Sequence, residues 1–288
     1  IPCDNRYFRI ESGPWAGRTL HELYQEAYTP WEWQPRLKKF ADEIGIILFS
    51  TPFDSTAVDF LEEMDVPCHK IASFELVDIP LIRKAASTGK PLIMSTGMAS
   101  LAEIEQAFAA ARESGCCDLV LLKCNSAYPA PPGEMNLATI RHLSEAFGVP
   151  AGLSDHTLGI AVPVAAVALG ACVIEKHFTL SRARKGPDSF FSIEPAELKA
   201  MVEAIRTAEQ AVGTVSYAVS EKQAESRVFR RSLFVVKDMK AGEPFTPENV
   251  RSIRPGHGLP PKHMSEIMKR TCRRDIAVGT PLSWELVD

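Results

Sequence analysis

Short apolar runs alternate with longer amphipathic stretches between residues 46 and 179. The apolar runs predict six strands, at Ile46–Phe53, His69–Glu75, Pro91–Gly97, Leu119–Asn125, Ala151–His156 and Val173–Thr179. The stretches between them predict helices at Ser55–Met64, Ile79–Thr88, Ser100–Ser114, Leu137–Phe147 and Ile160–Leu169. Because strands that alternate with helices usually pair in parallel, the pattern favours an α/β fold whose sheet is covered on both faces.

A closed (β/α)8 barrel needs eight strands, which is more than this pattern provides. The region before residue 46 has helical patterns at Thr19–Ala27 and Trp31–Ile44 but no convincing strand. The sequence also begins at Ile1 without a methionine. Two interpretations follow: an open sheet, or a (β/α)8 TIM-type barrel whose first two strands belong to a segment outside this sequence.

The C-terminal part of the chain has a different pattern. Pro195 suits the first position of a last long helix, and Gly213 suits its end. The polar residues 214–228 show no strand pattern and form a candidate linker. We therefore predict a barrel domain over residues 1–213, a linker, and a small β-rich domain over residues 229–288.

That small domain contains an internal repeat. The stretch from Asp238 to Val250 matches the stretch from Asp275 to Val287 in one register, including the glycine and proline of a turn. Two copies of a turn followed by a short helix predict a pseudo-twofold domain. Chance similarity of turn residues is the weaker alternative, and the repeat bears on fold rather than on chemistry.

The composition is that of an ordinary globular protein, with 45% hydrophobic and 24% charged residues. A net charge of −4 argues against nucleic acid or an anionic membrane as a partner. The longest apolar run, from Ile160 to Ile174, is interrupted by Pro163 and is shorter than the ~18 residues of a membrane-spanning helix. The seven cysteines include no C-x-x-C pair, and scattered free thiols suit a reducing cytoplasm.

Candidate chemistry is sought at the C-terminal ends of the strands, where barrel enzymes carry their active sites. Lys70 and Glu75 bracket one strand, where an inward lysine can bind an anion and a rim carboxylate can act as a base. Outside a barrel, such a pair is more often a surface ion pair. Ser95 and Ser154 end two further strands, and hydroxyls at such positions either cap helices or help to bind phosphate.

Two other strand ends lead into unusual loops. Ser126 and Tyr128 begin a proline-rich loop, where they are candidates for the rim, although the prolines themselves predict only a rigid turn. Asp188 ends the Gly-Pro-Asp sequence that follows the last strand. Such a sequence is commonly just a turn, but its position brings Asp188 near the same rim.

His156 and His177 are the strongest pair in the sequence, because they end consecutive strands. Neighbouring strands lie ~4.8 Å apart, so both imidazoles can reach one ion. Two protein ligands leave coordination positions open for water and substrate, and two histidines with oxygen donors suit Mn²⁺ better than structural zinc. A hydrogen-bonded core histidine is the usual alternative, and the two interpretations are about equally supported by the pattern alone.

These segments together resemble the sialic acid synthase family. The resemblance rests on Lys70–Glu75, Ser95–Met98, Tyr128–Pro131, Gly152–Thr157, Glu175–Phe178 and Gly186–Asp188, in the family's order. The tail resembles the family's antifreeze-like (SAF) domain through Ile253–Gly256. Within the family, Gly17–Leu20, Thr29–Trp33 and Ser252–Gly256 resemble the bacterial pseudaminic acid synthase branch.

The resemblance implies a synthase that joins phosphoenolpyruvate to an amino-sugar aldehyde, here a 2,4-diacetamido-2,4,6-trideoxyhexose. It implies that phosphoenolpyruvate is bound by Lys70, Ser73, Ser95, Ser126 and Ser154. The metal, Mn²⁺ with Mg²⁺ and Co²⁺ as alternatives, would be bound by the two histidines. Glu75 would be the base, and Tyr128 and Asp188 would position the sugar hydroxyls and the metal-bound waters.

The resemblance also implies a domain-swapped homodimer, in which Arg254 from one tail contacts the sugar's acyl group in the partner's site. The chain departs from the family at its start, because two strands that carry an acidic residue and a lysine are not found. We therefore expect a truncated N-terminus. Two rival functions remain: an N-acetylneuraminic acid synthase that uses N-acetylmannosamine, and a truncated, non-catalytic protein that binds carbohydrate or a partner.

Overall fold

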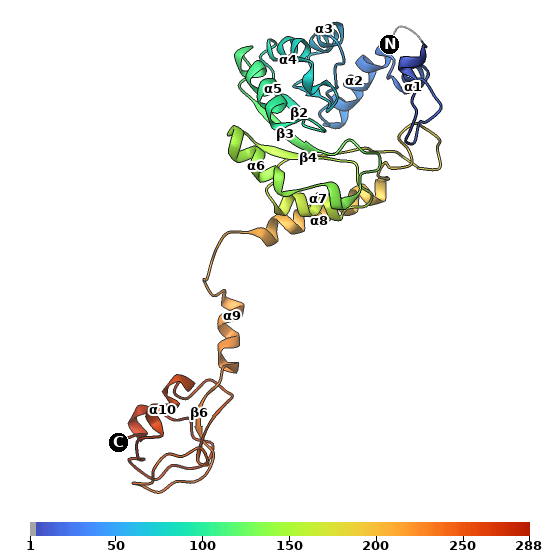
Figure 1. The fold of residues 1–288 in the computed structure, drawn as a ribbon. Coiled ribbons are helices and arrows are strands. Elements are labelled where there is room, and N and C mark those ends of the chain that lie inside the picture. Colours follow the sequence, from blue (N-terminus) through green and yellow to red (C-terminus); the bar gives the residue numbers. More distant parts are fainter. Residues whose placement is uncertain (1–3) are drawn as a thin grey trace. The chain divides into compact units, whose positions relative to one another are not determined.

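The computed structural model describes residues 4–288, which form two compact units that divide after Gly213 (Figure 1). The first is an α/β unit built on a parallel sheet, and the second, Thr214–Asp288, contains an antiparallel strand pair. Within the part of the chain that the structure describes, no helix is long and apolar enough to cross a membrane.

The sheet of the first unit has five parallel strands in the order β1-β2-β3-β4-β5. In chain order they are His69–Ile71, Leu92–Ser95, Leu119–Cys124, Ala151–Asp155 and Ile174–Lys176. Because all five strands run in the same direction, their C-terminal ends share one rim. This curled parallel sheet confirms the predicted α/β class.

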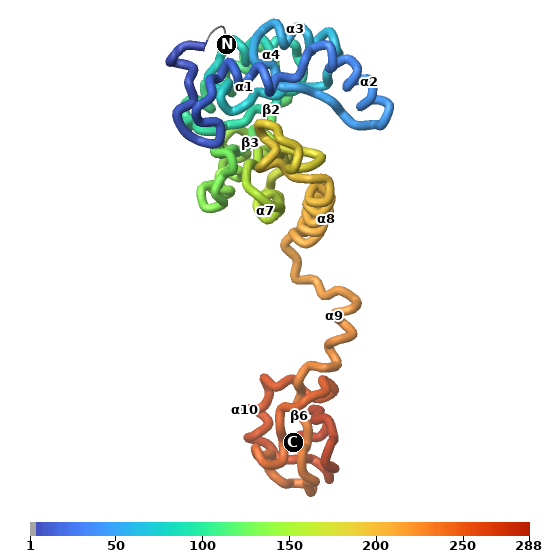
Figure 2. Tube along the Cα trace, turned by 90° about the vertical axis from the view of Figure 1, so that its right-hand side faces the viewer, coloured from blue at the N-terminus to red at the C-terminus, as the bar shows by residue number. Residues whose placement is uncertain are grey.

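Helices alternate with the strands along the chain and cover the sheet (Figure 1 and Figure 2). They are α3 (Ser55–Glu63), α4 (Ile79–Ala86), α5 (Leu101–Glu113), α6 (Ala138–Phe147), α7 (Ala161–Ala168) and α8 (Pro195–Val212). The start of α5 shows how local sequence fixes a helix end. The Ser100 hydroxyl accepts a hydrogen bond from the N–H of Glu103, and the Glu103 carboxylate accepts one from the N–H of Ser100 at 2.7 Å. This reciprocal capping satisfies two of the free N–H groups of the first turn.

The two faces of the sheet have different roles. One face carries the fully buried side chains of Ile71, Met94, Leu121 and Leu153, which belong to the core that packs against the helices. Truncating such a side chain to alanine typically costs about 2–5 kcal/mol of stability. Because successive side chains alternate, residues such as Lys70 and Ser154 project from the opposite face.

The predicted strand at Ile46–Phe53 is wrong. Among the described residues, this segment contributes a single bridge, between Ser50 and His69. Ile46 and Ile47 are 60% and 74% exposed, so the β-branched side chains that suggested a strand are not packed in a sheet. A strand needs a continuous hydrogen-bonded neighbour, which high β-propensity alone does not supply.

Two further strands are shorter than predicted. The strand predicted at His69–Glu75 ends at Ile71, because the chain turns into a short 3-10 helix, η3, at Glu75–Val77. Lys70 therefore lies in the strand, whereas Glu75 lies on this helix. The strand predicted at Val173–Thr179 is reduced to β5.

The N-terminal segment contains the helices that were predicted there. The pattern at Thr19–Ala27 forms α1 (Leu20–Ala27), and the pattern at Trp31–Ile44 forms η2 (Trp31–Trp33) and α2 (Gln34–Ile44). The 3-10 helix η1 (Arg6–Phe8), which was not predicted, precedes them. Thr19 and Glu22 form a capping box at the start of α1, and the left-handed Gly45 ends α2. Residues 9–19 form a closed loop between Arg9 and Thr19, which are joined by an antiparallel bridge.

The first helices of the second unit are α9 (Glu221–Glu225) and η5 (Ser226–Phe229). Its strands β6 (Ser232–Val235) and β7 (Val250–Ile253) pair in antiparallel register. The short helices η6 (Pro261–His263), α10 (Met264–Ile267) and η7 (Trp284–Leu286) complete it. Buried Leu233, Phe245 and Leu282 belong to its own apolar core.

The repeat in this unit produces a pseudo-twofold arrangement, as predicted. Asp238 accepts the N–H of Val278 at 2.8 Å, and its counterpart Asp275 accepts the N–H of Ala241 at 2.9 Å. Backbone hydrogen bonds repeat in the same way. The N–H of Gly242 donates to the Cys272 carbonyl, and the equivalent N–H of Gly279 donates to the Val235 carbonyl. Likewise, the N–H of Phe245 donates to the Arg270 carbonyl, and the equivalent N–H of Leu282 donates to the Leu233 carbonyl. Each half therefore completes the hydrogen bonds of the other.

Candidate active site

Lys70 is the charged centre of the rim. Its side chain projects from β1, is almost fully buried, and donates from Nζ to Ser95 Oγ at 2.8 Å and to the Ile71 carbonyl at 2.9 Å. Glu175 Oε2 lies 3.6 Å from the same Nζ, and Glu175 Oε1 accepts the hydroxyl of Ser154 at 2.8 Å. Burial lowers the pKa of Lys70, and the nearby Glu175 carboxylate opposes that shift.

A second hydroxyl pair lies beside this network. The Oγ atoms of Ser73 and Ser126 are 2.9 Å apart. Gly97 lies against them with φ of +52°, and a Cβ atom there would approach Ser73 Cβ to 2.4 Å. Only glycine therefore allows β1, β2 and β3 to bring their terminal loops this close. We refer to Lys70, Ser73, Ser95, Ser126 and Ser154 as the floor of the site.

The other part of the rim consists of rings. The ring centroids of His156 and His177 lie 5.2 Å apart, and Tyr128 lies 4.4 Å from His156 and 6.1 Å from His177. Phe191 packs 4.8 Å from His177, and Asp188 Oδ2 lies 3.4 Å from His177 Nδ1. We refer to these five residues as the wall of the site.

The strand ends behind the wall are fixed by a buried ion pair. Lys176 Nζ donates to Asp155 Oδ2 at 2.5 Å and to the Thr157 carbonyl at 2.6 Å, and Asp155 Oδ1 accepts the N–H and hydroxyl of Thr157. Asp155 and Lys176 lie directly opposite each other on β4 and β5. Because side chains alternate along a strand, this pair leaves His156 and His177 on the rim face.

The two histidines fit a metal site with open coordination positions. His156 Nδ1 lies 2.7 Å from the Asn125 carbonyl, and His177 Nδ1 faces Asp188, so one nitrogen of each ring already has an oxygen partner. Metal-binding histidines usually have such a partner on the other ring nitrogen. The Cys124 side chain also lies within hydrogen-bonding reach of the His156 side chain. Within residues 4–288, no group of three or more His, Cys, Asp and Glu side chains is arranged to hold a metal ion.

Glu75 has the environment of a base. Its Oε2 is buried and has no hydrogen-bond partner among the described residues. Burial raises the pKa of this carboxyl, with a smaller contribution from the negative charge of Asp78, while Lys70 opposes the shift. A carboxylate with a free lone pair and a raised pKa can accept a proton from water. Burial likewise raises the pKa of the Tyr128 hydroxyl, which therefore remains a hydrogen-bond donor.

Residues 3–217 match the NeuB family model, and residues 230–288 match the SAF domain model. The chain belongs to the NeuB family. It is 44% identical to the pseudaminic acid synthase of Helicobacter pylori, over 96% of this chain and 82% of that protein. It is 45% identical to the pseudaminic acid synthase of Campylobacter jejuni serotype O:23/36, over 98% and 82%.

The fold of this NeuB family chain is also found in solved structures. The N-acetylneuraminic acid synthetase of Leptospira borgpetersenii, crystallised with citrate, superposes with a TM-score of 0.67 at 34% identity. That match covers 71% of this chain and 72% of the other. The family membership and the SAF domain predicted from the motifs are therefore confirmed.

The sequence patterns did not identify every residue of the candidate site. Glu175, which connects Lys70 with Ser154, was missed, although it lies two positions before His177 and so on the same strand face. Phe191 and Trp15 were also missed, because nothing local marks them as rim residues. Arg254 belongs to the second unit, where it is exposed directly after β7.

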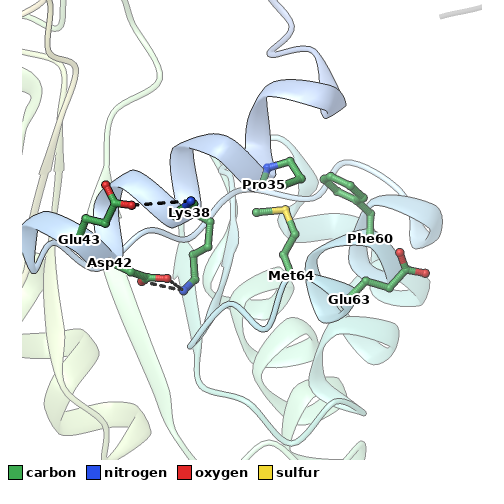
Figure 3. A pocket seen from close by; sticks show the side chains of 8 residues that line it. Pro35, Lys38, Asp42, Glu43, Phe60, Glu63 and Met64 are labelled. Atoms are coloured by element: carbon green, nitrogen blue, oxygen red, sulfur yellow. Dashed lines mark hydrogen bonds and ion pairs between the residues drawn. The ribbon is translucent and has the colours of Figure 1, made fainter.

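The NeuB rim is distinct from the groove of about 730 Å³ between α2 and α3 (Figure 3). In that groove, Lys38 and Lys39 pair with Asp42 and Glu43 of their own helix. The remaining lining residues are Pro35, Phe60, Glu63 and Met64. None of the predicted site residues lines it.

Proposed function

We propose that the chain condenses phosphoenolpyruvate with a 2,4-diacetamido-2,4,6-trideoxyhexose, giving pseudaminic acid and phosphate. The observation that carries this proposal is its 44–45% identity to two pseudaminic acid synthases over 96–98% of its length. The rim supports it, because a buried cation with several hydroxyls lies beside two histidines and a carboxyl group of raised pKa.

In this proposal, the floor binds phosphoenolpyruvate. The ammonium group of Lys70 is buried, and it donates to Ser95 instead of to water. Because little water surrounds this positive charge, it can interact strongly with an anion. Ser73, Ser95, Ser126 and Ser154 supply hydroxyls that can donate to phosphate or carboxylate oxygens once the anion displaces their present partners.

The reaction forms one carbon–carbon bond, and at C2 a carbon–oxygen bond to water forms while the carbon–oxygen bond to phosphate breaks. C3 of phosphoenolpyruvate attacks the aldehyde carbon of the open-chain sugar, and the aldehyde oxygen takes up a proton and becomes a hydroxyl. Water adds to C2, and Glu75 accepts its first proton. The tetrahedral intermediate then collapses to the C2 ketone, and its remaining hydroxyl proton leaves with the phosphate. The unpartnered Oε2 of Glu75 supports this assignment.

The wall binds the sugar. Tyr128 donates a hydrogen bond from its protonated hydroxyl, and Asp188 orients His177 and the sugar hydroxyls. A divalent cation, Mn²⁺ in preference to Mg²⁺ or Co²⁺, would be held by His156 and His177 and would polarise the aldehyde oxygen. The Nδ1 contacts of both rings support this role.

The proposal extends to the assembly. A catalytic domain over residues 1–213 would be followed by a linker over 214–228 and an antifreeze-like domain over 229–288, and each tail would serve the site of a partner in a homodimer. Arg254 would then contact the acyl group of the sugar. Its loop is well supported, since Ser232 Oγ donates to the Pro255 carbonyl at 2.7 Å.

Complementation tests the exchange of tails. An Arg254→Ala subunit mixed with a His177→Ala subunit regains part of the lost activity, because each mixed dimer contains one site without either lesion. Absence of recovery after verified subunit exchange contradicts the swapped arrangement but leaves the reaction itself untouched.

Product analysis tests the reaction. The purified protein, supplied with Mn²⁺, phosphoenolpyruvate and the diacetamido sugar, releases phosphate and a nine-carbon acid of the expected mass. A product from N-acetylmannosamine instead would identify an N-acetylneuraminic acid synthase. Binding of either sugar with no turnover would support the non-catalytic alternative.

A further inference from the structure

Residues 9–19 form a loop that is closed by its own backbone. The N–H of Ile10 donates to the Arg18 carbonyl at 2.8 Å, and the N–H of Gly17 donates to the Ile10 carbonyl at 2.9 Å. Gly13 and Gly17 have φ of +85° and +87°, the left-handed region that side chains disfavour. The loop therefore presents Trp15, near its tip, from a defined backbone.

Trp15 contacts two segments that are far away in the sequence. Its Nε1 donates to the Pro187 carbonyl at 3.1 Å, and its ring centroid lies 5.7 Å from that of Tyr128. In Figure 1, the dark-blue N-terminal loop accordingly lies beside the yellow loop that follows β5. A tilted aromatic pair and a satisfied indole N–H are the two contacts that fix a half-buried tryptophan.

Both contacts lead directly to the wall. Pro187 immediately precedes Asp188, which faces His177, and Tyr128 packs against His156. Trp15 therefore connects the loop after β3 with the loop after β5. In contrast, Lys70 and Ser95 of the floor bond each other from strands β1 and β2, and Ser154 bonds Glu175 from strands β4 and β5.

We propose that Trp15 is a positioning residue that holds the Tyr128 and Asp188 loops together and thereby sets the affinity for the amino sugar. This inference rests on the proposed function and deepens it. Because Trp15 acts on the wall and not on the floor, its loss weakens sugar binding while leaving phosphoenolpyruvate binding unchanged.

Two substitutions separate the two contacts of Trp15. Trp15→Phe keeps a ring against Tyr128 but removes the N–H donor, and Trp15→Ala removes both. We expect the KM for the sugar to rise about threefold in Trp15→Phe and about tenfold in Trp15→Ala, with the KM for phosphoenolpyruvate within about twofold of wild type. A purely structural role would instead change both KM values and the thermal midpoint together.

Trp33→Phe is the matched control, because Trp33 is an exposed tryptophan on η2 in the same unit. It should change neither KM. Equal KM values in wild type, Trp15→Phe and Trp15→Ala overturn the inference while the proposed function stands.

A fluorescence measurement gives a readout that does not depend on turnover. With Trp31, Trp33 and Trp284 replaced by phenylalanine, Trp15 is the one remaining tryptophan of the sequence. Adding the diacetamido sugar without phosphoenolpyruvate should change its emission, whereas phosphoenolpyruvate alone should not. If the wild type shows no turnover but the sugar still changes the emission, only the proposed reaction is overturned. If there is neither turnover nor an emission change, both the proposed reaction and the role of Trp15 are overturned.

Discussion

The floor and the wall of the rim are built in different ways. The floor consists of a lysine and four serines, mostly on buried strand ends, and Lys70 with Ser95 and Ser73 with Ser126 form hydrogen bonds of 2.8–2.9 Å. The wall consists of four rings, with centroids 4.4–6.5 Å apart, together with Asp188, and most of it comes from loops. Short directional bonds fix the positions of the polar groups in the floor, whereas ring packing constrains the positions of the wall residues less strictly. This difference fits the proposed binding of a small anion at the floor and of the larger sugar at the wall.

The largest expected effect is in the wall. His156→Ala or His177→Ala should reduce kcat roughly 10³–10⁴-fold, because polarisation of a carbonyl by a metal contributes several kcal/mol. Steady-state kinetics with saturating Mn²⁺ measures this loss. His142→Ala, an exposed histidine on α6, should retain full activity. If the two wall variants remain as active as this control, the histidines do not hold the metal.

The second-largest effect is expected from replacing Glu75, the proposed general base. Glu75→Gln should lower kcat ~10²–10⁴-fold while leaving both KM values near normal, since a lost general base affects the transition state. The exposed Glu63→Gln is the control. Because Glu75 must be ionised to act and burial raises its pKa, kcat/KM of the wild type should fall with decreasing pH at a value above the ordinary glutamate range. Full turnover in Glu75→Gln would assign the base elsewhere.

A smaller effect, on the KM for phosphoenolpyruvate, is expected from a substitution in the floor and distinguishes the floor from the wall. Lys70→Ala should raise the KM for phosphoenolpyruvate about 10–100-fold, the magnitude for hydrogen bonds to a charged group, with little change in the KM for the sugar. Lys84→Ala on α4, which removes the half-buried ion-pair partner of Asp59, should change neither KM. A parallel rise in both KM values in Lys70→Ala would show that floor and wall are not separable.

The smallest expected effect is on stability, and it comes from Gly97, which packs against the floor residue Ser73. Gly97→Ala should destabilise the protein by about 1–3 kcal/mol, because the new methyl group meets Ser73 Cβ and the residue has a left-handed backbone. Gly89→Ala is a matched control with φ of +75° and open space around the added atom, so it isolates the backbone contribution. Urea unfolding compares them, and equal midpoints would mean that the floor tolerates expansion.

The sequence alone predicted the strands and rim residues that are marked by residues close to them in the chain. The strands β2, β3 and β4 lie within their predicted runs, because their buried apolar residues are contiguous. Ile46–Phe53 failed since its apolar residues lack a continuous pairing partner. Among the rim residues, His156 and His177 could be predicted from strand ends, whereas Trp15 reaches Pro187 across 172 positions, a contact that only the tertiary fold creates.

The interlocked halves of the second unit bear on how fast it folds. Asp238 pairs with Val278 and Asp275 with Ala241, so the bonds that define each half link positions far apart in a unit of modest length. Loop-closure entropy must be lost before such contacts form, and folding rates decrease as contacts become less local. The unit is therefore expected to fold on the millisecond-to-second scale in one cooperative step, and neither half alone would retain structure.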